Sequence, residues 1–332
     1  MRLIQFFSGD SRHVGVVDGD QIKIVSDAPS VLELALRADV RGESLATIVE
    51  EQLSEKSVSY EELIAEKRLL PPLDHPDSAH CYVTGTGLTH LGSAKARDSF
   101  HSEASAKTDE PETDSMRLFR KGLDGGKPGP GKISVQPEWF YKGNGSCIAA
   151  PEHELPSPPF AMDAGEESEL VGLYVIGQKR RVLRVGFAIG NEFSDHVMER
   201  QNYLYLAHSK LRACSFGPEL LVGDLPNDIQ GQVRIVRDGT ELWQDSFLTG
   251  EKNMSYTIAN LEHHHFKYPA FRVPGDVHCH YFGTATLSIS AGIEIQSGDR
   301  IEISAPEFGR PLRNTVQLSD EPGNTPVECQ AL

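Results

Sequence analysis

The sequence has few cysteines, and none of them are arranged as a pair. The five are widely scattered, their number is odd, and no two form a C-x-x-C motif: Cys81, Cys147, Cys214, Cys279 and Cys329. A disulfide framework is therefore disfavoured, and reduced thiols are expected. We expect a cytoplasmic protein, because the N-terminal stretch MRLIQFFSGDSR also turns polar too early for the apolar core of a signal peptide.

The sequence also lacks an excess of positive charge and any long apolar run. Its 32 Lys and Arg residues face 48 Asp and Glu residues, and the net charge is −16. No basic cluster with interleaved aromatic residues occurs, so we expect no nucleic-acid partner. No apolar run approaches the length of a membrane span, so we expect no membrane partner. An acidic substrate would need local positive charge from Lys, Arg or a metal ion.

Common nucleotide-binding and serine-hydrolase motifs are missing as well. The sequence contains no G-x-x-x-x-G-K-[ST] loop and no G-x-S-x-G elbow. The stretch GTGLTHLG comes close to G-x-G-x-x-G, but its sixth position is His90 and no βαβ pattern follows. Kinase, serine-hydrolase and dinucleotide-binding interpretations therefore have no support.

The first 72 residues predict a small α+β domain. The runs RLIQFF, HVGVV and QIKIV indicate a hairpin over residues 2–25 with an Asp-Gly turn before its last run. Helical spacing follows from Ser30 to Lys67, with Ser30 and Ser44 as candidate N-caps and a last short helix stopped by Pro71 and Pro72. Because LLPPLDHPD is typical of a stiff connector, we place a domain boundary near residue 72.

Residues 73–332 predict a second, mainly β domain. β-type runs dominate from residue 133, and two helical stretches interrupt them near 195–208 and 255–264; the runs are ISVQPEWFY, ELVGLYVIG, VLRVGFAIG, QVRIVRDG, TATLSISAG and RIEIS. This mixture indicates an α+β fold that is mainly β, with a large and mostly antiparallel sheet system. Residues 93–132 are polar, lack core periodicity and end in a Gly/Pro run, which is typical of a lid or functional loop.

Three carboxylates stand at the ends of two consecutive predicted strands. Glu167 and Glu169 lie at the start of the stretch EESELVGLYVIG, and they share one face because side chains alternate along a strand. A glutamate pair at a strand end is by itself more often solvent-exposed. However, Glu192 ends the next apolar run, and antiparallel pairing would bring it close to the other two. Clustered carboxylates repel unless a cation holds them, so the pattern predicts a Mg²⁺ or Mn²⁺ site.

These residues belong to a series of motifs that resembles the fumarylacetoacetate hydrolase superfamily. The E-S-E-L strand followed by V-G-F-A-I-G-N-E-F-S is similar to its metal-site signature, an E-x-E strand and an N-D-x-S turn. SKLRACSFGPELLVG, VPGDVHCHYFGTA and SGDRIEISAPEFGRPLRNTV resemble three further family segments in the same order. Residue 192 is Glu where the family has Asp, and no glutamate follows His90 at the spacing of the family's lid motif.

The resemblance covers about residues 79 to 316 and implies a fold, an activity and an assembly. It implies a mixed β-roll or sandwich, and a homodimer. THLGSA, QPEWFYKG, GNEFSDH and LEHHHFKYPAFR resemble a sugar-acid subgroup associated with non-phosphorylative breakdown of L-arabinose and related sugars. The implied reaction is a lyase reaction, dehydration of a 2-keto-3-deoxy-pentonate such as 2-keto-3-deoxy-L-arabinonate to 2,5-dioxopentanoate through an enolate held at the metal ion.

The resemblance also implies roles for individual residues. Glu167, Glu169 and Glu192 are the expected metal ligands, and Lys210 would balance the charge of the enolate. Gly283 and Thr284 would contact the substrate, Thr284 at its carboxylate; Lys142 would line the site, and His90 would move a proton from the lid. Each residue also has a structural interpretation: a surface lysine, a strand threonine, or a local hydrogen-bonding histidine.

Two other functions remain open at this point. The same site in a hydrolase would cleave the C–C bond of a 2,4-diketo acid by attack of water on the C4 carbonyl. A sugar-acid sensor would bind the same ligand without turnover. The runs His263-His264-His265 and His278-Cys279-His280 suggest zinc, but consecutive residues do not readily face one ion, and we expect both to be structural.

Overall fold

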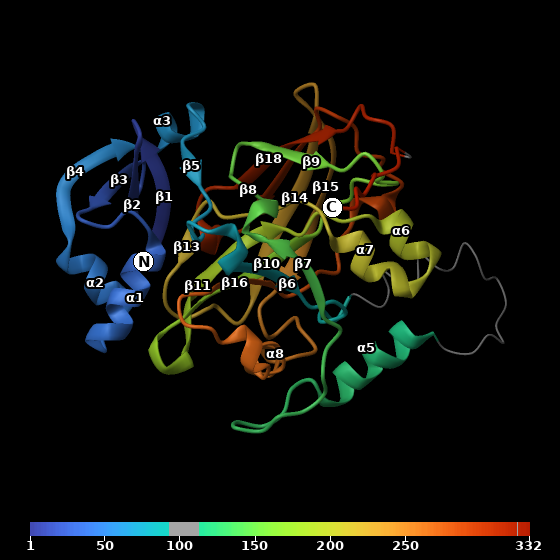
Figure 1. Ribbon diagram of the computed structural model, residues 1–332, viewed down its shortest axis with the longest axis horizontal. Coiled ribbons are helices and arrows are strands. Elements are labelled where there is room, and N and C mark those ends of the chain that lie inside the picture. Colours follow the sequence, from blue (N-terminus) through green and yellow to red (C-terminus); the bar gives the residue numbers. More distant parts are fainter. Residues whose placement is uncertain (93–112, 324) are drawn as a thin grey trace.

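The protein, described here from a computed structural model, is built on two β-sheets (Figure 1). The structure describes residues 1–92, 113–323 and 325–332. A thirteen-stranded sheet has the main path β4-β3-β2-β1-β13-β11-β10-β16-β6-β7, and a five-stranded sheet has the order β15-β14-β17-β18-β9. The predicted class, α+β and mainly β, is confirmed.

The N-terminal part is an antiparallel meander covered by helices. It contains strands β1 (Arg2–Ser8), β2 (Ser11–Asp18), β3 (Gln21–Val25) and β4 (Leu53–Ser59) and helices α1 (Val31–Arg41), α2 (Leu45–Glu51) and α3 (Tyr60–Ala65). The hydroxyls of Ser30 and Ser44 accept the main-chain N–H groups of Glu33 and Thr47, so both predicted N-caps are confirmed. Helix α3 ends before the predicted Pro71, and Leu69–Leu70 forms strand β5 beside β1.

The N-terminal strands continue into the larger sheet, since β1 pairs with β13 (Leu220–Leu221). The division of the chain near residue 72 remains a prediction. Of the predicted lid, residues 93–112 lie outside the described part of the chain. Residues 114–125 form an unpredicted helix, α5 (Asp114–Gly125), whose hydroxyl cap is Thr113.

The rest of the larger sheet curls into a roll. Its strands are β6 (Cys81–Gly85), β7 (Phe140–Asn144), β8 (Ile148–Ala149), β10 (Ser168–Ile176), β11 (Val182–Asn191), β12 (Cys214–Phe216) and β16 (Val277–Tyr281). Strand β8 pairs with β12, which pairs with β11, while β8 follows β7 in the chain through a short turn. The sheet path therefore returns on itself, and we call the β7–β8–β12 closure the seam.

Strands β10 and β11 run through the middle of the molecule. Every residue of β10 is buried, and so are the last seven of β11, because both faces of this pair are covered. One face packs with the N-terminal helices α1 and α2, and the other packs on the five-stranded sheet. That sheet consists of β9 (Glu154–Ser157), β14 (Ile229–Arg237), β15 (Thr240–Thr249), β17 (Arg300–Ser304) and β18 (Leu312–Leu318).

Both predicted helical stretches are confirmed, one predicted strand is wrong, and a second is mostly wrong because only the last two residues of ISVQPEWFY, Phe140 and Tyr141, belong to a strand. Helices α6 (His196–Gln201) and α7 (Leu206–Lys210) fill the first stretch, and α8 (Ile258–Phe266) fills the second. The run TATLSISAG forms no strand; its second half is a 3₁₀ turn, Ser288–Ala291. The reason is tertiary, because the N–H and hydroxyl of Ser288 donate to the buried carboxylate of Glu166 rather than to a neighbouring strand.

Short 3₁₀ turns connect the remaining elements: Ser78–His80, Gly145–Cys147, Gln178–Arg180, Tyr203–Tyr205, Pro269–Phe271 and Pro306–Phe308. Among residues 1–92, 113–323 and 325–332, no helix is both long enough and apolar enough to cross a bilayer.

Candidate active site

Three glutamate carboxylates meet where strands β10 and β11 pair. Ser168 lies opposite Asn191, the last residue of β11, in the antiparallel register. Glu167 and Glu169 are the neighbours of Ser168, and Glu192 directly follows Asn191, so the three glutamates lie close together. The main-chain N–H of Glu192 donates to the carbonyl oxygen of Glu167 at 3.0 Å. One carboxylate oxygen from each residue lies within 4.8 Å of the others, and all three side chains are buried. The structure thus brings together the three predicted metal ligands.

The electrostatics of this carboxylate triad favour a bound cation. Burial, followed by the charges of Glu167 and Glu192, raises the pKa of Glu169 well above its ordinary value. Burial also raises the pKa of Glu192 to about 7. Burial opposes ionisation of Glu167 too, but Lys210 and His196 outweigh it and hold its pKa well below its ordinary value. Three ionised carboxylates at this separation need additional positive charge, and an all-oxygen donor set fits Mg²⁺ or Mn²⁺.

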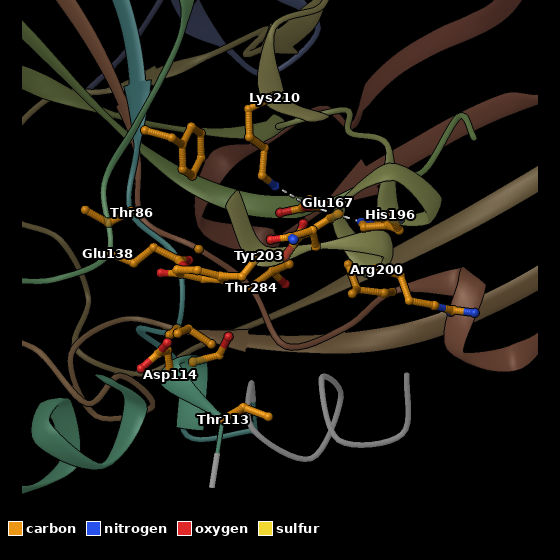
Figure 2. A pocket seen from close by; sticks show the side chains of 18 of the residues that line it. Thr86, Thr113, Asp114, Glu138, Glu167, His196, Arg200, Tyr203, Lys210 and Thr284 are labelled. Carbon is orange, nitrogen blue, oxygen red and sulfur yellow. Dashed lines mark hydrogen bonds and ion pairs between the residues drawn. The ribbon is translucent and has the colours of Figure 1, made fainter. Parts of the chain in front are cut away.

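Lys210 is the cation closest to the triad. It ends helix α7, and its Nζ lies 2.5 Å from Glu167 Oε1 and 2.5 Å from Glu192 Oε2. Figure 2 shows its side chain extending toward Glu167. Although burial disfavours the ammonium form, the two carboxylates raise the pKa of Lys210 above its ordinary value. Lys210 is therefore a fixed positive charge at the pocket, and its role in balancing the charge of an enolate stays a prediction.

Lys142 lies in a different place from the one predicted. Its side chain has no exposed surface, and its Nζ lies 2.7 Å from Glu192 Oε1. The same ammonium donates to the carbonyl oxygens of Phe193 at 2.6 Å and Lys210 at 3.0 Å. It is not among the residues that line the pocket beside the triad. Lys142 therefore supports Glu192 from behind instead of standing where a substrate would contact it.

His90 also lies outside the pocket lining. Its Nδ1 is 3.1 Å from the hydroxyl of Thr89 and its Nε2 is 2.9 Å from the hydroxyl of Thr249. Burial lowers the pKa of His90 to about 4, so the ring is neutral at physiological pH. This geometry supports the local hydrogen-bonding interpretation of His90, and it offers no direct path for a proton to the pocket.

The loop that begins at Gly283 closes one side of the site. The main-chain N–H of Gly283 donates to Glu169 Oε2 at 2.7 Å, so this predicted substrate contact is instead bonded to a carboxylate of the triad. Thr284 and Leu287 line the pocket, as predicted for Thr284. Farther along, the N–H of Ser288 donates to Glu166 Oε1 at 2.7 Å, and its hydroxyl donates to Glu166 Oε2. Glu166 and Glu169 thus hold the loop at both ends.

The pocket in front of the triad has a volume of about 390 Å³. Its wall includes several polar residues that the sequence did not identify: Asp114, Glu138, His196, Arg200 and Tyr203 (Figure 2). Glu138 is buried and is not a member of the triad. The stretches QPEWFYKG and GNEFSDH, which carry part of the family resemblance, contain Glu138 and His196, but their spacing does not indicate which side chains face the pocket.

His196 connects the triad to a fourth carboxylate. Its Nε2 is 3.1 Å from Glu167 Oε1 and its Nδ1 is 3.3 Å from Asp163 Oδ2. Burial opposes protonation, but these two carboxylates prevail and raise the pKa of His196 to about 10. A protonated His196 orients Glu167 in the way that outer partners commonly orient metal ligands.

The two histidine runs make hydrogen bonds within the core. His265 Nε2 lies 3.0 Å from His278 Nδ1, and the indole N–H of Trp139 donates to His265 Nδ1 at 3.2 Å. His280 Nδ1 lies 2.7 Å from the hydroxyl of Thr84. Among the described residues, the Glu167–Glu169–Glu192 triad is the one group of His, Cys, Asp and Glu side chains that gathers as metal ligands do. The structural interpretation of the histidines therefore fits the geometry.

Curated relatives of the chain are named as sugar-acid dehydratases. The chain is 27% identical over 199 residues to a 2-dehydro-3-deoxy-D-arabinonate dehydratase of Saccharolobus solfataricus, covering 55% of each chain. It is 27% identical over 143 residues to a probable 2-keto-3-deoxyxylonate dehydratase of Haloferax volcanii, covering 41% of this chain and 47% of the relative. The matches span about half the length of these relatives. No family model matches the chain.

Solved structures show the same fold. A 2-keto-3-deoxy-D-arabinonate dehydratase complexed with magnesium and 2,5-dioxopentanoate superposes with a TM-score of 0.70 at 19% identity, over 97% of this chain and all of the other (100%). A fumarylacetoacetate hydrolase from Exiguobacterium antarcticum superposes with a TM-score of 0.60 at 16% identity, over 96% of this chain and 100% of the other. The resemblance and the fold predicted from the sequence are therefore confirmed.

Proposed function

We propose that this protein is a divalent-metal-dependent hydro-lyase that converts a 2-keto-3-deoxy-pentonate, such as 2-keto-3-deoxy-L-arabinonate, to 2,5-dioxopentanoate. The observation that carries this proposal is the buried carboxylate triad, two members of which, Glu167 and Glu169, line a pocket of about 390 Å³. The names of the two curated relatives support the reaction class, and the neighbouring structure with magnesium and 2,5-dioxopentanoate supports the kind of ligand.

Glu167, Glu169 and Glu192 would hold Mg²⁺ in this proposal, and Mn²⁺ would suit the same oxygen donors. Such an ion supplies Lewis acidity that withdraws electrons from a 2-oxo acid and acidifies its C3–H bond. Lys142, Lys210 and His196 keep the carboxylates in place, because each forms an ion pair or hydrogen bond with at least one of them from a buried position. Lys210 adds a permanent positive charge where negative charge develops on the substrate.

Glu138 is our candidate for the group that moves the proton. It is a buried, pocket-lining glutamate outside the triad, so its carboxylate is not one of the expected metal ligands. It would accept the C3 proton and return it to the C4 hydroxyl, which leaves as water. The resulting alkene then isomerises to the aldehyde with no further gain or loss of atoms. Thr284, on the pocket wall, would donate its hydroxyl to the substrate carboxylate.

A second candidate is the hydrolysis of a 2,4-diketo acid at the same site, because the fold is shared with a fumarylacetoacetate hydrolase. We further propose a cytoplasmic homodimer that functions in sugar breakdown of the L-arabinose type. These last points rest on the resemblance alone, and molar mass from light scattering of the purified protein tests the dimer.

Incubation of the purified protein with each substrate class separates the two reactions. With 2-keto-3-deoxy-pentonate and Mg²⁺, we expect a product that forms a hydrazone at a new aldehyde, with loss of one water in the mass spectrum. A 2,4-diketo acid that yields two acids would favour the hydrolase instead. Tight binding of either compound without any turnover in Mg²⁺ or Mn²⁺ would indicate the sensor, and it would exclude both enzymes.

A further inference from the structure

Four of the five cysteines gather in one core, although they are far apart in the sequence. Cys81 on β6, Cys214 on β12 and Cys279 on β16 are buried in the same hydrophobic cluster, and Cys147 packs against it from the turn between β7 and β8. Cys329 is exposed in the C-terminal segment. The active site described above uses none of these thiols, so their clustering has no explanation in the proposed reaction.

Cys147 and Cys214 face each other across the seam. Their Sγ atoms lie 3.9 Å apart. Cys214 is opposite Ile148 in the parallel β8–β12 pairing, so Cys147 is one residue away from direct register. With ordinary strand spacing and rise, this places the two Cα atoms about 6 Å apart, inside the range that a disulfide spans.

Cys147 has the access and the electrostatic surroundings of a reactive thiol. It is partly exposed and lines a surface cavity of about 880 Å³ beside Tyr141, Ser146 and Leu211. The contact with Cys214, and after it the charge of Lys142, lower the pKa of the Cys147 thiol although burial opposes this. Burial raises the pKa of Cys214 well above its ordinary value. Cys147 is therefore the thiol that attacks first, and Cys214 is the one that resolves.

The seam also carries the two lysines that support the carboxylate triad. Lys142 is on β7, a few residues before Cys147 in the chain. Lys210 is the last residue of α7, a few residues before Cys214. Lys142 joins the two segments by its hydrogen bond to the carbonyl oxygen of Lys210 at 3.0 Å. Because a disulfide has an S–S bond of about 2.05 Å, the two sulfur atoms must approach by about 1.9 Å from their separation of 3.9 Å. The approach of the two sulfur atoms would therefore displace the segments that carry the ammonium groups of Lys142 and Lys210.

We propose that Cys147 and Cys214 are an oxidation site, in which peroxide forms a reversible disulfide across the seam and thereby weakens metal binding and turnover at the triad. The Cys147 thiolate attacks one oxygen of hydrogen peroxide, the O–O bond breaks, and the departing hydroxide takes up a proton to form water. The sulfur of Cys214 then attacks the sulfenic acid, the S–O bond breaks, and the hydroxide leaves as water with the Cys214 proton. Two thiols are oxidised and one peroxide is reduced to two waters; an added dithiol reverses the change.

The test uses the full chain with Cys329→Ser, which removes the exposed thiol. After brief exposure to hydrogen peroxide and its removal by catalase, we expect a mass loss of about 2 Da and a non-reduced peptide that links Cys147 to Cys214. The apparent Kd for Mg²⁺, measured by calorimetry, should rise about tenfold, and dithiothreitol should restore it. Cys147→Ala should abolish both the linkage and the loss of Mg²⁺ affinity, and Cys214→Ala is the second variant should the first fail to fold.

The effect on turnover rests on the proposed function, whereas the linkage and the Mg²⁺ titration do not. If the protein turns over none of the substrates, the linked peptide and the calorimetry still decide this proposal. The proposal is wrong if no linked peptide forms, if the linked protein binds Mg²⁺ as the reduced protein does, or if peroxide still weakens Mg²⁺ binding in Cys147→Ala.

Discussion

Lys142 donates a hydrogen bond to the main-chain carbonyl oxygen of Lys210 at 3.0 Å, so one lysine positions the segment that carries the other. Both ammonium groups reach Glu192, Lys142 at Oε1 over 2.7 Å and Lys210 at Oε2 over 2.5 Å. Glu192 is thus held from two directions, by a residue of strand β7 and by the last residue of helix α7. A buried carboxylate needs such partners, because burial without compensation disfavours its charged form.

Replacing Lys142 should destabilise the protein. Lys142→Met retains much of the side-chain volume but removes a buried cation from Glu192 and from two carbonyl oxygens. We expect a loss of about 3 kcal/mol in the free energy of unfolding, measured by denaturant titration. The exposed Lys56→Met is the matched control and should change that free energy by less than about 0.5 kcal/mol. Equal effects of the two substitutions would refute the supporting role of Lys142.

Glu169→Gln should remove metal binding without unfolding the protein. The substitution keeps an acceptor for the N–H of Gly283 but removes one negative charge from the triad. We expect calorimetry to show at least about a hundredfold weaker binding of Mg²⁺, and turnover to fall in parallel. The exposed Glu154→Gln should bind Mg²⁺ like the unaltered protein. Full Mg²⁺ affinity in Glu169→Gln would place the metal elsewhere.

Glu138→Gln should separate chemistry from metal binding. Because Glu138 lines the pocket outside the triad, its amide form should leave Mg²⁺ affinity unchanged. Loss of the proton acceptor should lower kcat by about 10² to 10⁴ and stop deuterium exchange at C3 of the substrate. Exchange at an unaltered rate would mean that another group removes the C3 proton.

Ser288→Ala should loosen the loop that carries Thr284. The substitution removes the hydroxyl donor of Ser288 to Glu166 and keeps its main-chain N–H donor, which lies at 2.7 Å. A buried carboxylate that loses such a donor costs about 1 to 3 kcal/mol of stability, so we expect a lower melting temperature and a higher KM. Ser290→Ala, in the same turn but exposed, is the control and should change neither quantity. A KM that stays constant in Ser288→Ala would separate the loop from substrate binding.

Acid should destabilise the protein through its buried histidines. Burial lowers the pKa of His278 and of His280 to about 3, and it lowers that of His265 as well. These rings are neutral in the folded protein, whereas in the unfolded chain they take up protons near pH 6.5. Their contribution to stability is therefore complete above about pH 6.5 and decreases as the pH falls, by about 1.4 kcal/mol per pH unit for each histidine.

The pH dependence of denaturant unfolding between pH 7.5 and 5 measures this effect. His280→Gln should reduce the slope of the unfolding free energy against pH by about 1.4 kcal/mol per unit. His208→Gln, at an exposed position, should leave the slope as it is. A slope that His280→Gln does not alter would show that His280 is protonated in the folded state.

Much of the fold could be predicted from local patterns, and the exceptions have a tertiary cause. Helix α1 and its Ser30 cap, the helical stretches after Glu192 and the apolar strands β10 and β11 follow from spacing and burial. The run TATLSISAG has β propensity but forms a turn, because Ser288 bonds to Glu166, 122 positions away in the chain. Helix α5 is amphipathic, but it lies in a segment whose overall polar, Gly- and Pro-rich composition indicated a loop, and that composition hid the short helix.

By itself, the sequence determined that Glu167, Glu169 and Glu192 stand at the ends of two consecutive strands. Alternation and antiparallel pairing are local rules, so they bring these carboxylates together in any fold that pairs the two strands. Only the tertiary structure decided that Lys142 lies behind Glu192, that His90 lies outside the pocket, and that Glu138 and His196 lie on its wall. Those positions depend on how the roll closes at its seam, and the closure is set by contacts between distant segments that leave no periodic signal along the chain.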